Sequence, residues 1–80
     1  MANPTDGSVL RHIEELVSQE HRFHAQEALS EQERAQLRAV EIELDQTWDL
    51  LRQRRALRAA GQDPDTAQVR SPDIVEKYEE

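Results

Sequence analysis

Two stretches of the chain carry apolar residues at the spacing of an amphipathic helix. In the first stretch, residues 8–28, the larger apolar side chains recur three or four residues apart, at Val9, Leu10, Ile13, Leu16, Val17 and Phe23. Side chains at this spacing share one face of a helix. Either Asp6 or Ser8 can cap the N-terminus, because its side-chain oxygen can accept from an amide of the first turn. The pattern predicts a helix over about residues 8–28.

The second stretch begins with a capping box, Ser30-Glu31-Gln32-Glu33. In this motif the Ser30 hydroxyl accepts from the Glu33 amide, and the Glu33 carboxylate accepts from the Ser30 amide. No proline or glycine follows until Gly61, which suits the left-handed position that ends a helix. We therefore expect a helix over about residues 31–60, whose apolar face carries Leu37, Val40, Leu44, Trp48 and Leu51.

The short connection between the two stretches predicts that the helices run antiparallel as a hairpin over residues 1–61, with the last turns of the longer second helix overhanging. Residues 62–80 form an acidic C-terminal tail. Within it, Ser71-Pro72-Asp73 has the form of a helix start, which indicates a short helix over residues 72–79. The predicted fold is all-α: an antiparallel two-helix hairpin with a short C-terminal tail or helix.

Length and composition make a lone hairpin marginal. The chain has 80 residues and no cysteine, so no disulfide reinforces its thin core. Because each helix of a lone hairpin is covered on one side only, we expect two copies to pair into a four-helix homodimer. The expected interface residues are Ile13, Leu16, Phe23, Leu37, Leu44, Trp48 and Leu51. Trp48 is interpreted as an anchor of the core or dimer, with a contact to some other protein as the alternative.

Four arginines gather near the end of the second helix, at Arg52, Arg54, Arg55 and Arg58. They suit the negative end of the helix dipole and can neutralise carboxylates of the tail. Alternatively, they form a patch by which a regulatory adaptor binds a larger protein. Nucleic acid is a weaker alternative, because the net charge of -7 repels phosphate. On the same helix, Glu41, Asp45 and Asp49 are interpreted as a solvated acidic strip.

The sequence indicates neither an enzyme nor a cofactor. It lacks a glycine-rich phosphate loop, and a two-helix hairpin encloses no preformed pocket. His21 and His24 share a side of the first helix, but they can hold zinc only if a second chain adds ligands, so we expect no metal site. No apolar run approaches the roughly 20 residues that span a bilayer, and the opening residues lack the regions of a signal peptide. We expect a cytoplasmic protein without membrane contact.

Several stretches of the chain resemble a known family. They are LSEQERA at residues 29–35, ELDQTWDLLRQRRALR at residues 43–58 and AGQDPD at residues 60–65. These stretches are similar to a family of small actinobacterial proteins classed as a domain of unknown function, and the resemblance covers nearly the whole chain. It implies a short helical protein and brings with it no activity, substrate or site.

Overall fold

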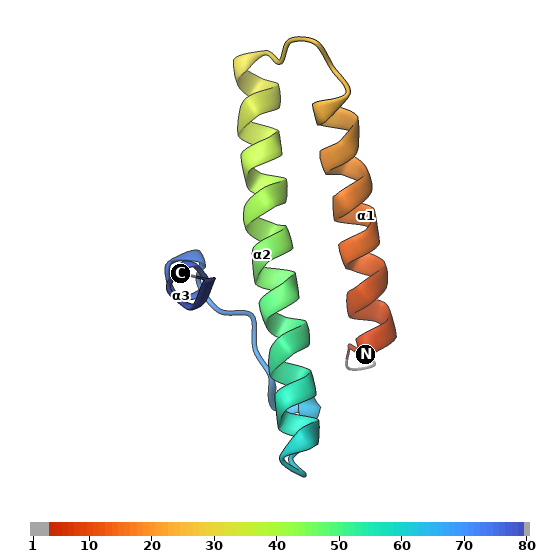
Figure 1. Cartoon of the computed structure of the whole chain (residues 1–80), viewed down its shortest axis with the longest axis vertical. Coiled ribbons are helices and arrows are strands. Elements are labelled where there is room, and N and C mark those ends of the chain that lie inside the picture. The colour runs from red at the N-terminus through yellow and green to blue at the C-terminus, as the bar shows by residue number, and fades with distance from the viewer. Residues whose placement is uncertain (1–3, 80) are drawn as a thin grey trace.

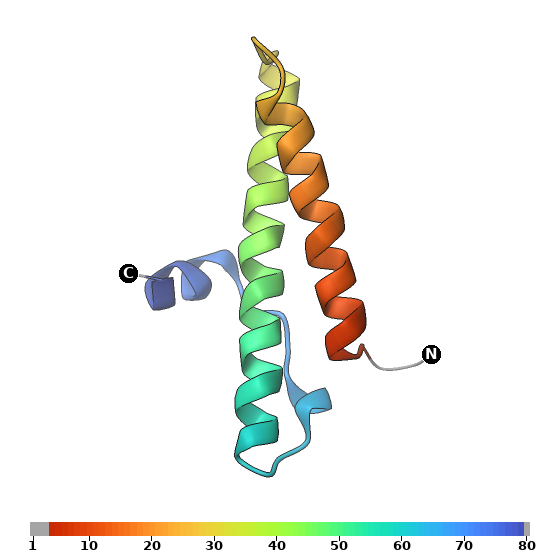
Figure 2. The ribbon, with the colours of Figure 1, turned by 45° about the vertical axis from the view of Figure 1, so that its right-hand side comes forward.

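Two long helices lie antiparallel, and a short third helix lies on the other side of the longer one. In the computed structural model, which describes residues 4–79 and the side chains of residues 4–75, α1 (Asp6–His24) and α2 (Glu31–Ala59) are followed by the 3₁₀ helix η1 (Pro64–Thr66) and by α3 (Pro72–Glu79). Helices α1 and α3 lie on opposite sides of α2 (Figures 1 and 2). No strand occurs among residues 4–79, so the predicted all-α hairpin with a short C-terminal helix is confirmed.

Both long helices begin with a capping box. At α2 it is the predicted one: the Glu33 amide donates to the Ser30 hydroxyl over 3.1 Å, and the Ser30 amide donates to the Glu33 carboxylate over 3.0 Å. At α1 the cap is Thr5, so the expectation of Asp6 or Ser8 is wrong. Ser8 is the reciprocal partner, because its amide donates to the Thr5 hydroxyl and its own hydroxyl accepts from the Thr5 amide. Asp6 is thereby left free to bind elsewhere.

Helix α1 ends at His24, four residues before the predicted end at residue 28, so the connection spans residues 25–30 instead of one or two residues. A longer helix would place the carboxylate of Glu27 at the negative end of the helix dipole, which is unfavourable. The observed last turn instead carries the basic residues His21, Arg22 and His24. No glycine or proline in this region signals the end.

Helix α2 ends at Ala59, within one residue of the prediction, and Gly61 reverses the chain. Gly61 has a φ of +75°, the left-handed conformation that glycine adopts without a steric penalty. The Gln62 amide donates to the Leu57 carbonyl over 2.8 Å, so a carbonyl of the last turn is satisfied. The chain then returns along α2 through η1.

The core has a main part between α1 and α2. Val9 and Ile13 of α1 pack with Leu51 of α2, which is 0% exposed, and Leu16 and Val40 are also buried. Around this cluster lie the partly buried residues Leu10, Val17, Leu44 and Leu50. A second, smaller part lies under α3, which packs on α2 and whose Val75 is buried. The tail therefore supplies some of the cover that the hairpin alone lacks.

Candidate interaction surface

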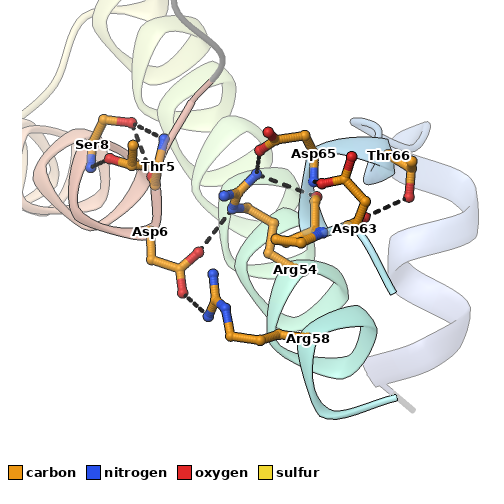
Figure 3. A network of polar contacts seen from close by, with 9 residues as sticks. Thr5, Asp6, Ser8, Arg54, Arg58, Asp63, Asp65 and Thr66 are labelled. Atoms are coloured by element: carbon orange, nitrogen blue, oxygen red, sulfur yellow. Dashed lines mark hydrogen bonds and ion pairs between the residues drawn. The ribbon is translucent and has the colours of Figure 1, made fainter. Parts of the chain in front are cut away.

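Arg54 joins three segments that lie far apart in the sequence (Figure 3). Its Nε donates to Asp6 at the start of α1 over 2.8 Å, and its Nη1 donates to Asp65 of η1 over 3.0 Å and to the Pro64 carbonyl over 3.2 Å. The residue is only 4% exposed. Arg54 therefore fastens the first turn of α1 and the 3₁₀ helix to the last turns of α2.

Asp6 is held between two guanidinium groups. Its second carboxylate oxygen accepts from Nη1 of Arg58, and Figure 3 shows the carboxylate pointing toward both arginines. The hydrogen bond from Arg58, followed by the one from Arg54, holds the pKa of Asp6 well below its ordinary value of 3.8. Asp6 is therefore ionised throughout the physiological pH range.

The four arginines proposed as a partner patch do not form one free surface. Arg54 is buried, whereas Arg52, Arg55 and Arg58 are exposed, and the Arg58 guanidinium group donates to Asp6. The contact between Arg54 and Asp65 agrees with the interpretation that the arginines neutralise carboxylates of the tail. One sequence signal points to the burial of Arg54, because it follows the buried residues Val40 and Thr47 at seven-residue steps along α2.

A row of polar side chains on α2 binds the extended segment before α3. Gln46 donates to the Arg70 carbonyl over 3.1 Å, and Gln53 donates to the Gln68 carbonyl over 2.7 Å. Between them Asp49 accepts from Arg70, over 2.9 Å at Nε and also at Nη2. Two glutamines thus bind the backbone of the tail, and one ion pair fixes its position along α2.

Asp49 is 1% exposed, so the prediction that it belongs to a solvated acidic strip is wrong for this residue. The hydrogen bond from Arg70 is the main cause that lowers its pKa. Of the other two residues of the strip, Glu41 is exposed and Asp45 is half-buried. The sequence around Arg70 has no helical periodicity, so no local pattern pairs it with Asp49.

The seven residues expected at a dimer interface fall into two groups. Ile13, Leu16 and Leu51 are buried inside one chain, so in this conformation they are not available to a second one. The other four reach the surface: Trp48 is 37% exposed, and the half-buried ones are Phe23, Leu37 and Leu44.

Leu37, Leu44 and Trp48 lie along one flank of the buried stripe of α2, because they are separated by one or two helical turns. At about 100° per residue, Glu43 lies on the opposite flank of that stripe. The Oε1 atom of Glu43 lies 3.2 Å from Nε2 of His12 on α1. The flank of α2 that carries Glu43 and the flank of α1 that carries His12 therefore lie on the same side of the hairpin. We call the side with Leu37, Leu44 and Trp48 the Trp48 face.

Helix α1 contributes two residues to the Trp48 face. Leu10 and Val17 are seven residues apart and lie on the flank of α1 opposite to His12. Both are partly buried against the core. The Trp48 face thus combines partly exposed apolar side chains of both long helices, whereas α3 lies on the side of α2 that faces away from α1 (Figure 2).

A shallow depression of about 650 Å³ lies between α2 and residues 66–70. Its lining includes Asp49 and Arg70, which bind each other. Because its pKa is lowered, Asp49 is not a proton donor near neutral pH.

The part of the chain that the structure describes shows neither a cluster of metal-binding side chains nor a helix that could span a membrane. Among the side chains of residues 4–75, no group of three or more His, Cys, Asp or Glu could hold a metal ion. His21 and His24 are exposed near the end of α1. In the same residues, no helix is long and apolar enough to cross a membrane.

Comparisons with known proteins identify relatives along almost the whole chain. Two uncharacterized proteins, one from Mycobacterium bovis and one from Mycobacterium tuberculosis, are each 56% identical to it over 79 residues, covering 94% of this chain and 91% of the relative. No solved structure matches the chain significantly. Residues 5–80 match the family described as "Protein of unknown function (DUF2630)", and the chain therefore belongs to this family, as the resemblance to small actinobacterial proteins of unknown function predicted.

Proposed function

We propose that this chain is a small, non-enzymatic protein-interaction module that acts as a homodimer through its Trp48 face. The observation that carries the proposal is the 37% exposure of Trp48 beside the half-buried Leu37 and Leu44. A large aromatic side chain gains most when a partner removes it from water, and tryptophan is enriched among the residues that dominate binding energy.

The arrangement of the three helices supports this choice of face. Helix α1 covers one side of α2 and α3 lies on the opposite side, while residues 68–70 bind Gln46 and Gln53 beyond the flank that carries Glu43, away from the Trp48 face. On the Trp48 face, Leu10 and Val17 of α1 add partly buried apolar side chains to Leu37, Leu44 and Trp48 of α2. A second copy presents the same residues, so a two-fold pairing buries both faces at once.

The chemistry of the two arginine-bound carboxylates also favours binding over catalysis. Asp6 and Asp49 are both held ionised by arginines, which makes each a structural anion. A general acid or base needs a pKa near the working pH. These groups serve to connect segments of the chain.

The alternative of an adaptor that binds a larger protein through the arginine-rich end of α2 has less support. Such a patch needs several accessible guanidinium groups, and Arg54 is 4% exposed. Arg58 also donates to Asp6. We therefore retain the homodimer as the proposal.

The deciding experiment is light scattering coupled to gel filtration, with the full chain loaded at concentrations from about 1 to about 500 μM. We expect the mass to rise from one chain to two. Trp48→Ala should shift the transition to higher concentration, whereas Ile42→Ala, which truncates a residue of similar exposure (36%), should shift it less. A wild-type chain that stays monomeric at every concentration would overturn the proposal.

A further inference from the structure

Four residues of α2 form a row along the Trp48 face. Arg34, Glu41, Trp48 and Arg55 follow one another at intervals of seven residues, and side chains at this spacing project from nearly the same side of a helix. All four are exposed. The row therefore presents one aromatic residue with a carboxylate two turns before it and a guanidinium two turns after it.

The charges in this row distinguish the two ways in which α2 can pair with its own copy. In a parallel pair, Glu41 lies opposite Glu41 and Arg55 opposite Arg55, so like charges repel. In an antiparallel pair centred on Trp48, Glu41 of each chain lies opposite Arg55 of the other. Two attractive contacts then replace two repulsive ones.

We propose that two copies pair with their α2 helices antiparallel and the two-fold axis beside Trp48, so that Glu41 of each chain pairs with Arg55 of the other. This inference rests on the proposed homodimer and adds its orientation and register. The two Trp48 side chains meet at the axis, and the half-buried Leu44 lies one turn away on each chain.

Glu41 and Arg55 cannot pair with each other within one chain. Glu41 and Arg55 are 14 residues apart on one helix, which places them about 21 Å apart along its axis. Reversing both charges in the same chain therefore creates no contact between residues 41 and 55 of that chain, and the contacts of each reversed side chain with its own helix neighbours are already present in the single variants. Any recovery that follows the double reversal has to come from contacts between two chains.

The test is a charge-reversal cycle on the full chain, with the dimer dissociation constant measured by sedimentation equilibrium at about 50 mM salt. By symmetry, Glu41→Arg or Arg55→Glu alone replaces two attractive contacts by two repulsive ones, so each should raise the dissociation constant about tenfold. The double variant should return to within about threefold of the wild type. Salt at about 1 M should reduce these differences.

Glu15→Arg is the matched control, because it makes the same charge change at an exposed position on the other flank of α1. Circular dichroism checks that every variant remains helical. If the wild type dimerises but the double variant is as weak as the weaker single one, the orientation proposed here is wrong and the homodimer stands. If the wild type never dimerises, both proposals fail.

Discussion

Arg54 is the residue that holds the start of α1 and the 3₁₀ helix η1 to α2. It is charged and buried, yet its guanidinium group reaches two carboxylates and one carbonyl. Among the described residues, no buried side-chain nitrogen or oxygen lacks a hydrogen-bond partner. Removing Arg54 would leave Asp6, Asp65 and the Pro64 carbonyl without this donor.

Arg54→Ala should therefore lower the free energy of unfolding by about 2 kcal/mol. The loss exceeds the net contribution of the ion pairs, because the two carboxylates and the carbonyl are left without this donor. Urea denaturation followed by circular dichroism measures the loss. Arg38→Ala, which truncates an exposed arginine of the same helix, should change the stability by less than about 0.5 kcal/mol. Equal losses in the two variants would show that Arg54 has no special structural role.

Acid should destabilise the fold through Asp6 and Asp49. Both have a lower pKa in the folded chain than the ordinary value of 3.8, so the unfolded chain binds protons first as the pH falls. Their stabilisation is fully present above about pH 5 and is lost progressively as the pH falls below about 4. Thermal melts between pH 7 and pH 3 should show this decline, and Asp6→Asn should make it shallower. An unchanged slope in Asp6→Asn would contradict the assignment.

At this scale the sequence reveals the positions of charges but not their partners. Arg54 lies at a helical phase shared with Val40 and Thr47, so its burial has a sequence signal. Its bond to Asp6 spans 48 residues, and that of Asp49 to Arg70 spans 21. No local pattern encodes contacts of this length, which explains why Asp49 was predicted to be solvated.

The capping box of α2 is the clearest local signal of an element, and it can be tested directly. Ser30→Ala removes the acceptor for the Glu33 amide and should lower the free energy of unfolding by about 1 kcal/mol. Ser18→Ala is the matched control, since alanine is the better helix former at that exposed position inside α1. Chemical denaturation of both variants compares the effects. An unchanged free energy of unfolding in Ser30→Ala would show that the cap contributes little to stability.

The third helix should depend on the ion pair between Arg70 and Asp49. Arg70→Ala removes the guanidinium group from the carboxylate of Asp49, which keeps its hydrogen bond from Gln53, and should weaken the docking of the tail. Amide hydrogen exchange should then accelerate at Ile74 and Val75, whose amides donate to the Ser71 carbonyl. The interior of α1 should keep its protection. Unchanged exchange at Val75 would mean that its burial alone holds the tail.

The elements were predictable where the sequence carries an explicit start or stop. The capping box at Ser30, the glycine after α2 and the Ser71-Pro72 start of α3 all gave bounds within a residue or so. The end of α1 carries no such signal, and there the prediction ran four residues too far. The position of the tail on α2 depends on Gln46 and Gln53, which look like ordinary surface residues in the sequence.

The whole molecule is elongated, with extents of 48 × 26 × 20 Å, and this shape leaves little interior. If the homodimer forms, unfolding releases two chains and the melting temperature depends on concentration. Raising the concentration from about 1 to about 100 μM should raise the melting temperature by about 5–10 °C. Calorimetry and circular dichroism cover this range together, and Trp48→Ala should reduce the shift. A constant melting temperature would indicate a chain that folds alone.

The ion pairs of Asp6 with Arg54 and Arg58 also affect when the chain can fold during translation. They join the first turn of α1 to residues that are translated 48 and 52 positions later. While the nascent chain is being extended, α1 can coil locally, but its beginning stays unfastened until the end of α2 has left the ribosome. Premature termination before Arg54 would therefore release a fragment that lacks both ion pairs of Asp6. We expect cellular proteases to degrade such a fragment.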